Sequence, residues 1–135
     1  MRIVSTYVPK KWDEKPYDII EGRMKCTKAS VEFAMSDDIE GTANVEYVMF
    51  YQSFDDRDPH SARAQYVALM RIAGKVKGKS GSFALMDNGT FEGGAARSTV
   101  TIIPDSGTGE LAKISGAGSY KADHTGCTME LDASF

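Results

Sequence analysis

The sequence is poor in the residues that build disulfides, metal centres and redox sites. Its 135 residues include two cysteines and two histidines. Cys26 and Cys127 have neither the spacing nor the neighbours of a zinc site, and two separated thiols in a reducing compartment are expected to stay free. With His60 and His124 as the only histidines, we expect no metal site, and nothing in the sequence predicts a cofactor.

Long apolar runs and an excess of basic residues are also missing. The formal net charge is −3, and without a basic patch we expect no nucleic-acid partner. No apolar run is long enough to cross a membrane, so we expect no membrane partner either. The N-terminus, MRIVSTYVPKKW, lacks the apolar core of a signal peptide, which favours a cytoplasmic location. The length fits a single domain over residues 1–135.

Helical periodicity is absent, and the pattern that is present is the two-residue alternation of β-strands. We expect about eight strands, the first at Ile3–Val8 and the last at Thr128–Phe135, with one helical turn near Gly109–Ile114. Asn88-Gly89 is a strong hairpin signal. Many short strands without covering helices favour closure into an antiparallel eight-stranded β-barrel, and the alternative is a two-sheet sandwich.

Predicted turns fix which residues face each other across neighbouring strands. A turn centred on Asp58-Pro59 places Tyr47 opposite Met70 on one face. On the other face it places Glu46 opposite Arg71, which would form a cross-strand ion pair. The face that carries Tyr47 is the more apolar and aromatic, so we assign it to the interior of the barrel.

The same reasoning identifies a candidate ligand site inside the barrel. A turn at Asn88-Gly89 places Leu85 opposite Glu92, so that Glu92 points into the lumen. Burial there would raise the pKa of Glu92 and suit it to proton transfer or to binding a polar group. The alternatives are a solvated carboxylate at the rim and tyrosines that only fill the core. The predicted ligand-binding residues are Glu92, Tyr47, Tyr51, Tyr66 and Met70.

The opposite face of the same strands carries an apolar strip. The outer strip consists of Val48, Phe50, Val67 and Leu69. An apolar strip on the outside of a small barrel is expected to be covered, and another copy of the chain is the expected partner. The sequence therefore predicts a homo-oligomer formed through this strip.

Three motifs carry a resemblance to a known family: WDEKPYD at Trp12–Asp18, VEYVMFY at Val45–Tyr51, and the run SGSFALMDNGTFEGG that begins at Ser80. With them the chain resembles, over nearly its whole length, a bacterial family of small proteins of unknown function. That family is similar in fold to the allene-oxide-cyclase and dirigent barrels, which implies a calycin-like barrel. Relatives often carry Glu at the position of Met70, so this chain would have one lumen carboxylate, Glu92, where they have two.

The resemblance implies no established activity, and three functions stay open. The first is a barrel that binds a small, partly apolar molecule in its lumen. The second is an enzyme of the isomerase or cyclase type, which rests on the resemblance of fold alone. The third is a structural barrel with a filled interior and no ligand. The volume of the interior distinguishes the third function from the other two.

Overall fold

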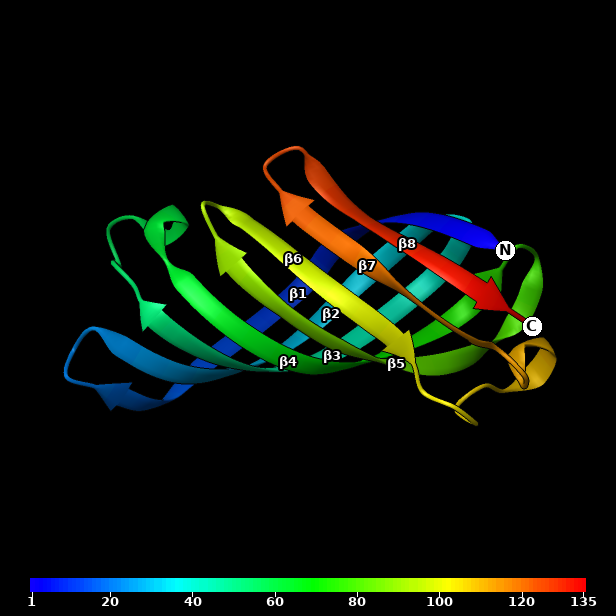
Figure 1. Cartoon of the computed structure of the whole chain (residues 1–135), viewed down its shortest axis with the longest axis horizontal. Coiled ribbons are helices and arrows are strands. Elements are labelled where there is room, and N and C mark those ends of the chain that lie inside the picture. The colour runs from blue at the N-terminus through cyan, green and yellow to red at the C-terminus, as the bar shows by residue number, and fades with distance from the viewer.

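A computed structural model describes all residues, 1–135, as eight antiparallel strands closed into a ring (Figure 1). Each strand pairs with the next along the chain, and β8 pairs with β1. The expectation of an all-β fold with eight antiparallel strands is confirmed. No helix is long and apolar enough to cross a membrane. The strands are β1 (Arg2–Ile20), β2 (Met24–Asp37), β3 (Ile39–Ser53), β4 (Arg63–Val76), β5 (Lys79–Glu92), β6 (Ala95–Ile102), β7 (Ser115–Asp123) and β8 (Gly126–Ser134).

Alternation along the strands separates the inside of the ring from the outside. On β3, the side chains of Val45, Tyr47 and Met49 are buried. Those of Val48 and Phe50, which alternate with them along the strand, are exposed. All eight strands contribute residues to one cluster of 26 buried hydrophobic residues, so the ring has a single core. The predicted assignment of the Tyr47 face to the interior is therefore confirmed.

One end of the ring is closed by the connection between β6 and β7. This connection contains the 3-10 turn η2 (Gly109–Leu111), which matches the predicted helical turn, and it lies at the same end as both termini (Figure 1). Leu111 and Ile114 are buried in the core cluster. Thr108 accepts a hydrogen bond from the backbone N–H of Ser82 at 3.0 Å, which fixes the connection to β5.

The other end of the ring carries four hairpin connections (Figure 1). The β3–β4 loop contains a second 3-10 turn, η1 (Pro59–Ser61), which was not predicted from the sequence. The β1–β2 hairpin is longer than predicted, because β1 continues past Pro9 and Pro16. The pairing with β2 shifts next to each proline, as expected for a residue that lacks a backbone N–H. This extension carries Trp12 and Glu14 to the open end.

The predicted pairing of β3 with β4 is wrong by two residues. Tyr47 lies opposite Ala68 rather than Met70, and Glu46 and Arg71 are not paired. The register shifts near the end of β3, where the strand meets the β3–β4 loop. A slip by an even number of residues leaves every side chain on its face, because the side-chain period is two. The interior face was therefore predicted correctly from a wrong register.

The predicted turn at Asn88-Gly89 is also wrong, since both residues lie within β5. The β5–β6 turn is Gly93-Gly94, whose φ values of 63° and 77° suit the tight hairpin turn that requires two residues in the left-handed region. Leu85 consequently lies opposite Ile102. Glu92 lies opposite Ala95, directly beside the turn and outside the core.

Candidate functional site

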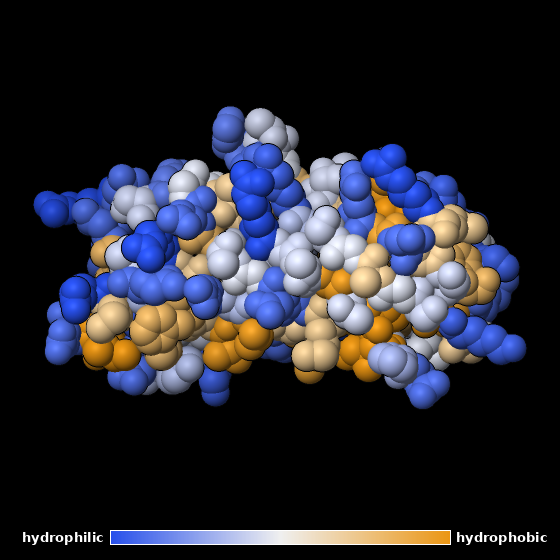
Figure 2. Space-filling model, viewed as in Figure 1, coloured by the Kyte–Doolittle hydropathy of each residue, from blue (hydrophilic) through white to orange (hydrophobic).

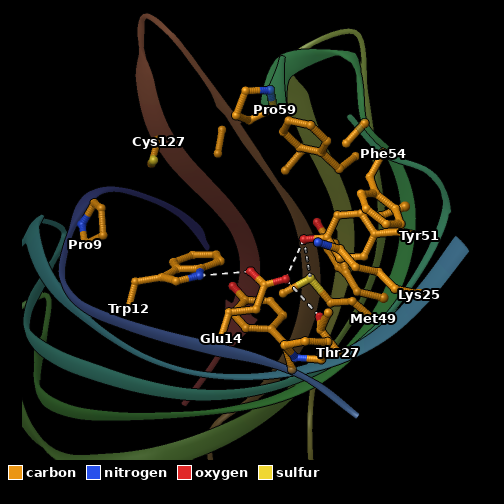
Figure 3. A pocket seen from close by; sticks show the side chains of 18 of the residues that line it. Pro9, Trp12, Glu14, Lys25, Thr27, Met49, Tyr51, Phe54, Pro59 and Cys127 are labelled. Carbon is orange, nitrogen blue, oxygen red and sulfur yellow. Dashed lines mark hydrogen bonds between the residues drawn. The ribbon is translucent and has the colours of Figure 1, made fainter. Parts of the chain in front are cut away.

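A cavity of about 560 Å³ occupies the end of the ring that carries the hairpin connections. Fifteen of its 23 lining residues are hydrophobic, so the cavity is largely apolar with a few polar groups, as is typical of small-molecule sites. Figure 3 draws 18 of these side chains, which surround one space inside the curved sheet. Its aromatic lining residues are Tyr7, Trp12, Phe33, Tyr47, Tyr51, Phe54, Tyr66, Phe91 and Tyr120.

Glu14 is a carboxylate held in one orientation on the cavity wall (Figure 3). The indole N–H of Trp12 donates to its Oε1 at 3.0 Å. The hydroxyls of Thr27 and Tyr51 donate to its Oε2 at 2.9 and 2.6 Å. Burial and the bond to Glu14 raise the pKa of Tyr51, so this hydroxyl keeps its proton and donates at neutral pH. Trp12 and Thr27 belong to the β1–β2 hairpin that carries Glu14, and the bond from Tyr51 joins this hairpin to β3.

Aromatic rings surround this carboxylate. The Trp12 ring stacks on the Tyr47 ring with 6.0 Å between centroids and 26° between planes. The Lys25 ammonium lies 4.3 Å from the ring centroid of Phe54 and 4.9 Å from that of Tyr51. These separations fall within the range of cation–π attraction. The cavity wall therefore already holds one ammonium group against aromatic faces.

Deeper in the ring, a chain of hydroxyl groups forms the inner part of the cavity wall. The Tyr66 hydroxyl lies 2.5 Å from Oγ of Ser98 and 3.0 Å from the Tyr120 hydroxyl, which is 3.5 Å from the Tyr47 hydroxyl. Burial raises the pKa of all three tyrosines. Gly89 makes this chain possible, because a Cβ there would lie 2.6 Å from the Tyr66 oxygen.

Asp87 is the buried carboxylate of the interior. It is 2% exposed and lies on β5 between Ala68 of β4 and Val100 of β6. Neither carboxylate oxygen has a hydrogen-bond partner. Burial raises the pKa of Asp87 to about 6, while the hydroxyls of Ser98 and Tyr120 act in the opposite direction. Asp87 therefore changes its charge close to neutral pH, next to the hydroxyl chain.

Three of the five predicted ligand-binding residues line the cavity, and two do not. Met70 is buried in the core and does not line the cavity. The expected position of Glu92 in the lumen is wrong: its side chain is 72% exposed and lies 3.7 Å from Arg63. The cause is the turn at Gly93-Gly94, which places Glu92 at the rim. The three predicted tyrosines line the cavity, namely Tyr47, Tyr51 and Tyr66.

The predicted site residues include neither the buried Asp87 nor the three carboxylates that line the cavity, Glu14, Asp55 and Asp56. Asp87 continues the alternation of Phe83 and Leu85, which would have revealed it had Asn88 not been assigned to a turn. Glu14 lies in a segment whose prolines hide the continuation of β1, so no pattern in the sequence identifies it.

Comparison with solved structures supports the fold. A crystal structure of a protein of unknown function from the DUF3224 family of Shewanella oneidensis MR-1 superposes on the chain with a TM-score of 0.76 and 20% identity. The match covers 100% of this chain and 97% of that one. A search of the curated proteins found no match. Residues 3–134 match the family described as "Protein of unknown function (DUF3224)". The chain therefore belongs to the DUF3224 family, as the resemblance to a family of unknown function led us to expect.

Proposed function

We propose that this protein binds a small, partly apolar molecule in the cavity at the open end of a calycin-like barrel. The observation that carries the proposal is the cavity itself, whose volume of about 560 Å³ lies within the range of small-molecule sites. A filled structural barrel would leave no such space. The largely apolar wall suits a ligand with an apolar body, and Glu14 with its three donors suits a polar group on that ligand.

The position of Trp12 provides a direct test, because it is the only tryptophan and it lies in the cavity wall. The probe is 1-aminoanthracene, a neutral aromatic amine whose emission rises in apolar surroundings. We expect saturable binding to a single site, with energy transfer from Trp12 to the bound probe. Absence of saturable binding would contradict the proposal.

Filling the cavity should abolish this binding. Ala64 is buried and lines the cavity, so Ala64→Phe places a ring in the space. Ala122 is half-buried and also lines it, and Ala122→Phe is the second variant if the first fails to fold. Ala73→Phe makes the same change on the exposed outer face and is the matched control. Equal binding by all variants would place the probe outside the cavity and contradict the proposal.

A second candidate function is favoured by Asp87 and the hydroxyl chain. Three hydrogen bonds link the four hydroxyls of Tyr47, Tyr66, Tyr120 and Ser98. They use three of the four protons, so one proton remains for another acceptor. A carboxyl that titrates near pH 6 beside such a chain can exchange that proton. This arrangement supports an enzyme of the isomerase or cyclase type, by analogy with the allene-oxide-cyclase barrels.

Proton-transfer activity can be tested on an enolisable apolar ketone such as 2-tetralone. The reaction removes a hydrogen from the carbon next to the carbonyl and returns a deuteron from the solvent. We expect the protein to accelerate deuterium incorporation in D2O, measured by proton NMR, and Asp87→Asn to remove the acceleration. The exposed Glu92→Gln variant is the control and should behave as wild type. A wild-type rate equal to that of buffer alone would count against this candidate.

A further inference from the structure

The charged groups of the cavity wall are mainly acidic. Glu14, Asp55 and Asp56 line the cavity together with one base, Lys25, which leaves a formal charge of −2 on the wall. Asp55 lies 3.6 Å from Arg57, so part of this charge is balanced outside the cavity. The negative field at the entrance favours the approach of cations over anions.

Glu14 carries one of these negative charges at a fixed position in the cavity wall. All three of its hydrogen-bond donors are neutral groups, namely an indole N–H and two hydroxyls. They orient the carboxylate and leave its charge without an opposite one. A carboxylate offers about four lone-pair sites, so one site remains after three bonds. A ligand cation is therefore the group that this carboxylate is best able to accept.

The aromatic residues around Glu14 also favour the binding of a cation. Trp12 donates to Glu14 and stacks on Tyr47. Phe54 and Tyr51 hold the Lys25 ammonium over their ring faces. An ammonium group bound between a carboxylate and such ring faces gains both charge pairing and cation–π attraction. The same rings supply an apolar surface for the rest of the ligand.

We propose that the cavity selects small amphiphilic amines, whose ammonium group is held by Glu14 and the surrounding rings while an alkyl or aryl body fills the apolar part. This inference rests on the proposed function, since it names the class of molecule that the cavity binds. Met49, Ala64 and Phe91, which line the cavity, would contact the apolar body.

Three matched probes separate the charge of the ligand from its shape. They are 4-phenylbutylamine, 4-phenylbutan-1-ol and 4-phenylbutyrate, which are cationic, neutral and anionic at pH 7. We expect the amine to bind about tenfold more tightly than the alcohol, because a hydrogen bond to a charged group is stronger than a neutral one. The butyrate should bind most weakly. Isothermal titration calorimetry gives the three dissociation constants.

Variants of two carboxylates, one inside the cavity and one outside it, locate the selectivity. Glu14→Gln should remove the preference for the amine and leave the affinity for the alcohol nearly unchanged. Glu92→Gln makes the same change at an exposed carboxylate that does not line the cavity, so it should retain the preference and serves as the matched control. Lys25→Met removes the competing ammonium from the wall and should tighten amine binding. Circular dichroism melts establish that each variant is folded.

The outcomes distinguish the two proposals. Binding of the alcohol and the butyrate at least as tightly as the amine would overturn the selection of amines and leave the binding function intact. A preference for the amine that survives Glu14→Gln would overturn the assignment of Glu14. Absence of binding for all three probes and for 1-aminoanthracene would overturn the proposed function, and the inference with it.

Discussion

Asp87 links the charge state of one buried side chain to the stability of the whole ring. Burial raises its pKa from 3.8 to about 6 in the folded chain. The folded state therefore binds more protons than the unfolded state between these values, and the free energy of unfolding falls as the pH rises through them. A shift of this size corresponds to about 3 kcal/mol of stability that is present below pH 4 and lost above pH 6.

Asp87→Asn should remove this dependence, because the amide does not ionise. We expect the variant to gain stability relative to wild type as the pH rises, by about 2 to 3 kcal/mol between pH 4 and pH 7.5. Urea unfolding at a series of pH values measures the difference. Glu92→Gln removes a carboxylate that is exposed at the rim and should leave the wild-type curve unchanged. Parallel curves for Asp87→Asn and wild type would show that Asp87 is not perturbed.

Gly89 occupies a strand position where a side chain has no room. A Cβ at this position would lie 2.3 Å from Oγ of Ser98 and 2.6 Å from the Tyr66 hydroxyl. Gly89→Ala should therefore destabilise the chain by about 1 to 3 kcal/mol, as is typical of overpacking, and break the Tyr66–Ser98 bond. Thr90→Ala changes the neighbouring exposed residue and should cost little. Thermal unfolding compares the two, and equal melting temperatures would contradict the prediction.

At the scale of strands and turns, the β5–β6 hairpin shows how two turn signals compete. Asn88-Gly89 is the stronger motif in general, but Gly93-Gly94 forms the turn. The later turn allows Asp87 and Gly89 to stay in the strand, where Gly89 accommodates the close approach of Tyr66. Tertiary packing decided between two locally acceptable turns, which a single sequence does not reveal.

Substitutions in these two turn motifs should differ in how much they lower the free energy of unfolding. Gly94 has φ of 77°, so Gly94→Val places a β-branched residue in the left-handed region and should cost about 1 to 3 kcal/mol. Asn88 is an exposed strand residue, and Asn88→Thr should change stability by less than about 0.5 kcal/mol. Urea denaturation of both variants is the measurement. A larger cost for Asn88→Thr would indicate that Asn88 forms a turn in solution.

The fold was more predictable than the site, for a physical reason. Alternation survives errors of register, so the interior face was correct although Tyr47 and Met70 are not paired. The cavity depends instead on where strands end and turn. Pro9 and Pro16 concealed the extension of β1 that brings Glu14 to the cavity. The turn at Gly93-Gly94 places Asp87 in the interior, where Glu92 had been predicted.

At the scale of the molecule, the two ends of the ring differ in a way that suits ligand binding. The connection around η2 closes one end with Leu111 and Ile114. The hairpins at the other end leave the cavity partly enclosed, with Glu14 in its wall. A rigid closed sheet between them holds the polar groups in place. One end therefore stabilises the core, and the other is free to carry the site.

The outer strip lies on the outer faces of β3 and β4. Figure 2 shows hydrophobic residues gathered along the lower edge of the molecule, where Figure 1 places β3, β4 and β5. Val48 pairs with Val67, and Leu69 pairs with Met86, which extends the strip onto β5. Each of these four side chains is exposed. Together they form one continuous apolar surface without a partner in the monomer.

We predict that a second copy of the chain covers the outer strip. An acidic residue, Glu46, and a basic residue, Arg71, both lie on the outer face beside Leu69. A two-fold axis through the strip can place each of these charges opposite its counterpart in the other copy, since the same patch meets itself. Burial of the strip contributes about 25 cal/mol per Å² of apolar area, from which the entropy cost of association is subtracted.

Leu69→Lys tests this association directly. Leu69 is 56% exposed in the monomer, so the substitution should leave the fold intact. It would place a charge in the centre of the interface, so we expect wild type to sediment as a dimer at micromolar concentration and Leu69→Lys as a monomer. Thr99→Lys adds the same charge on the exposed face of β6, outside the strip, and should remain dimeric. Sedimentation velocity gives all three masses, and a monomeric wild type would refute self-association through this strip.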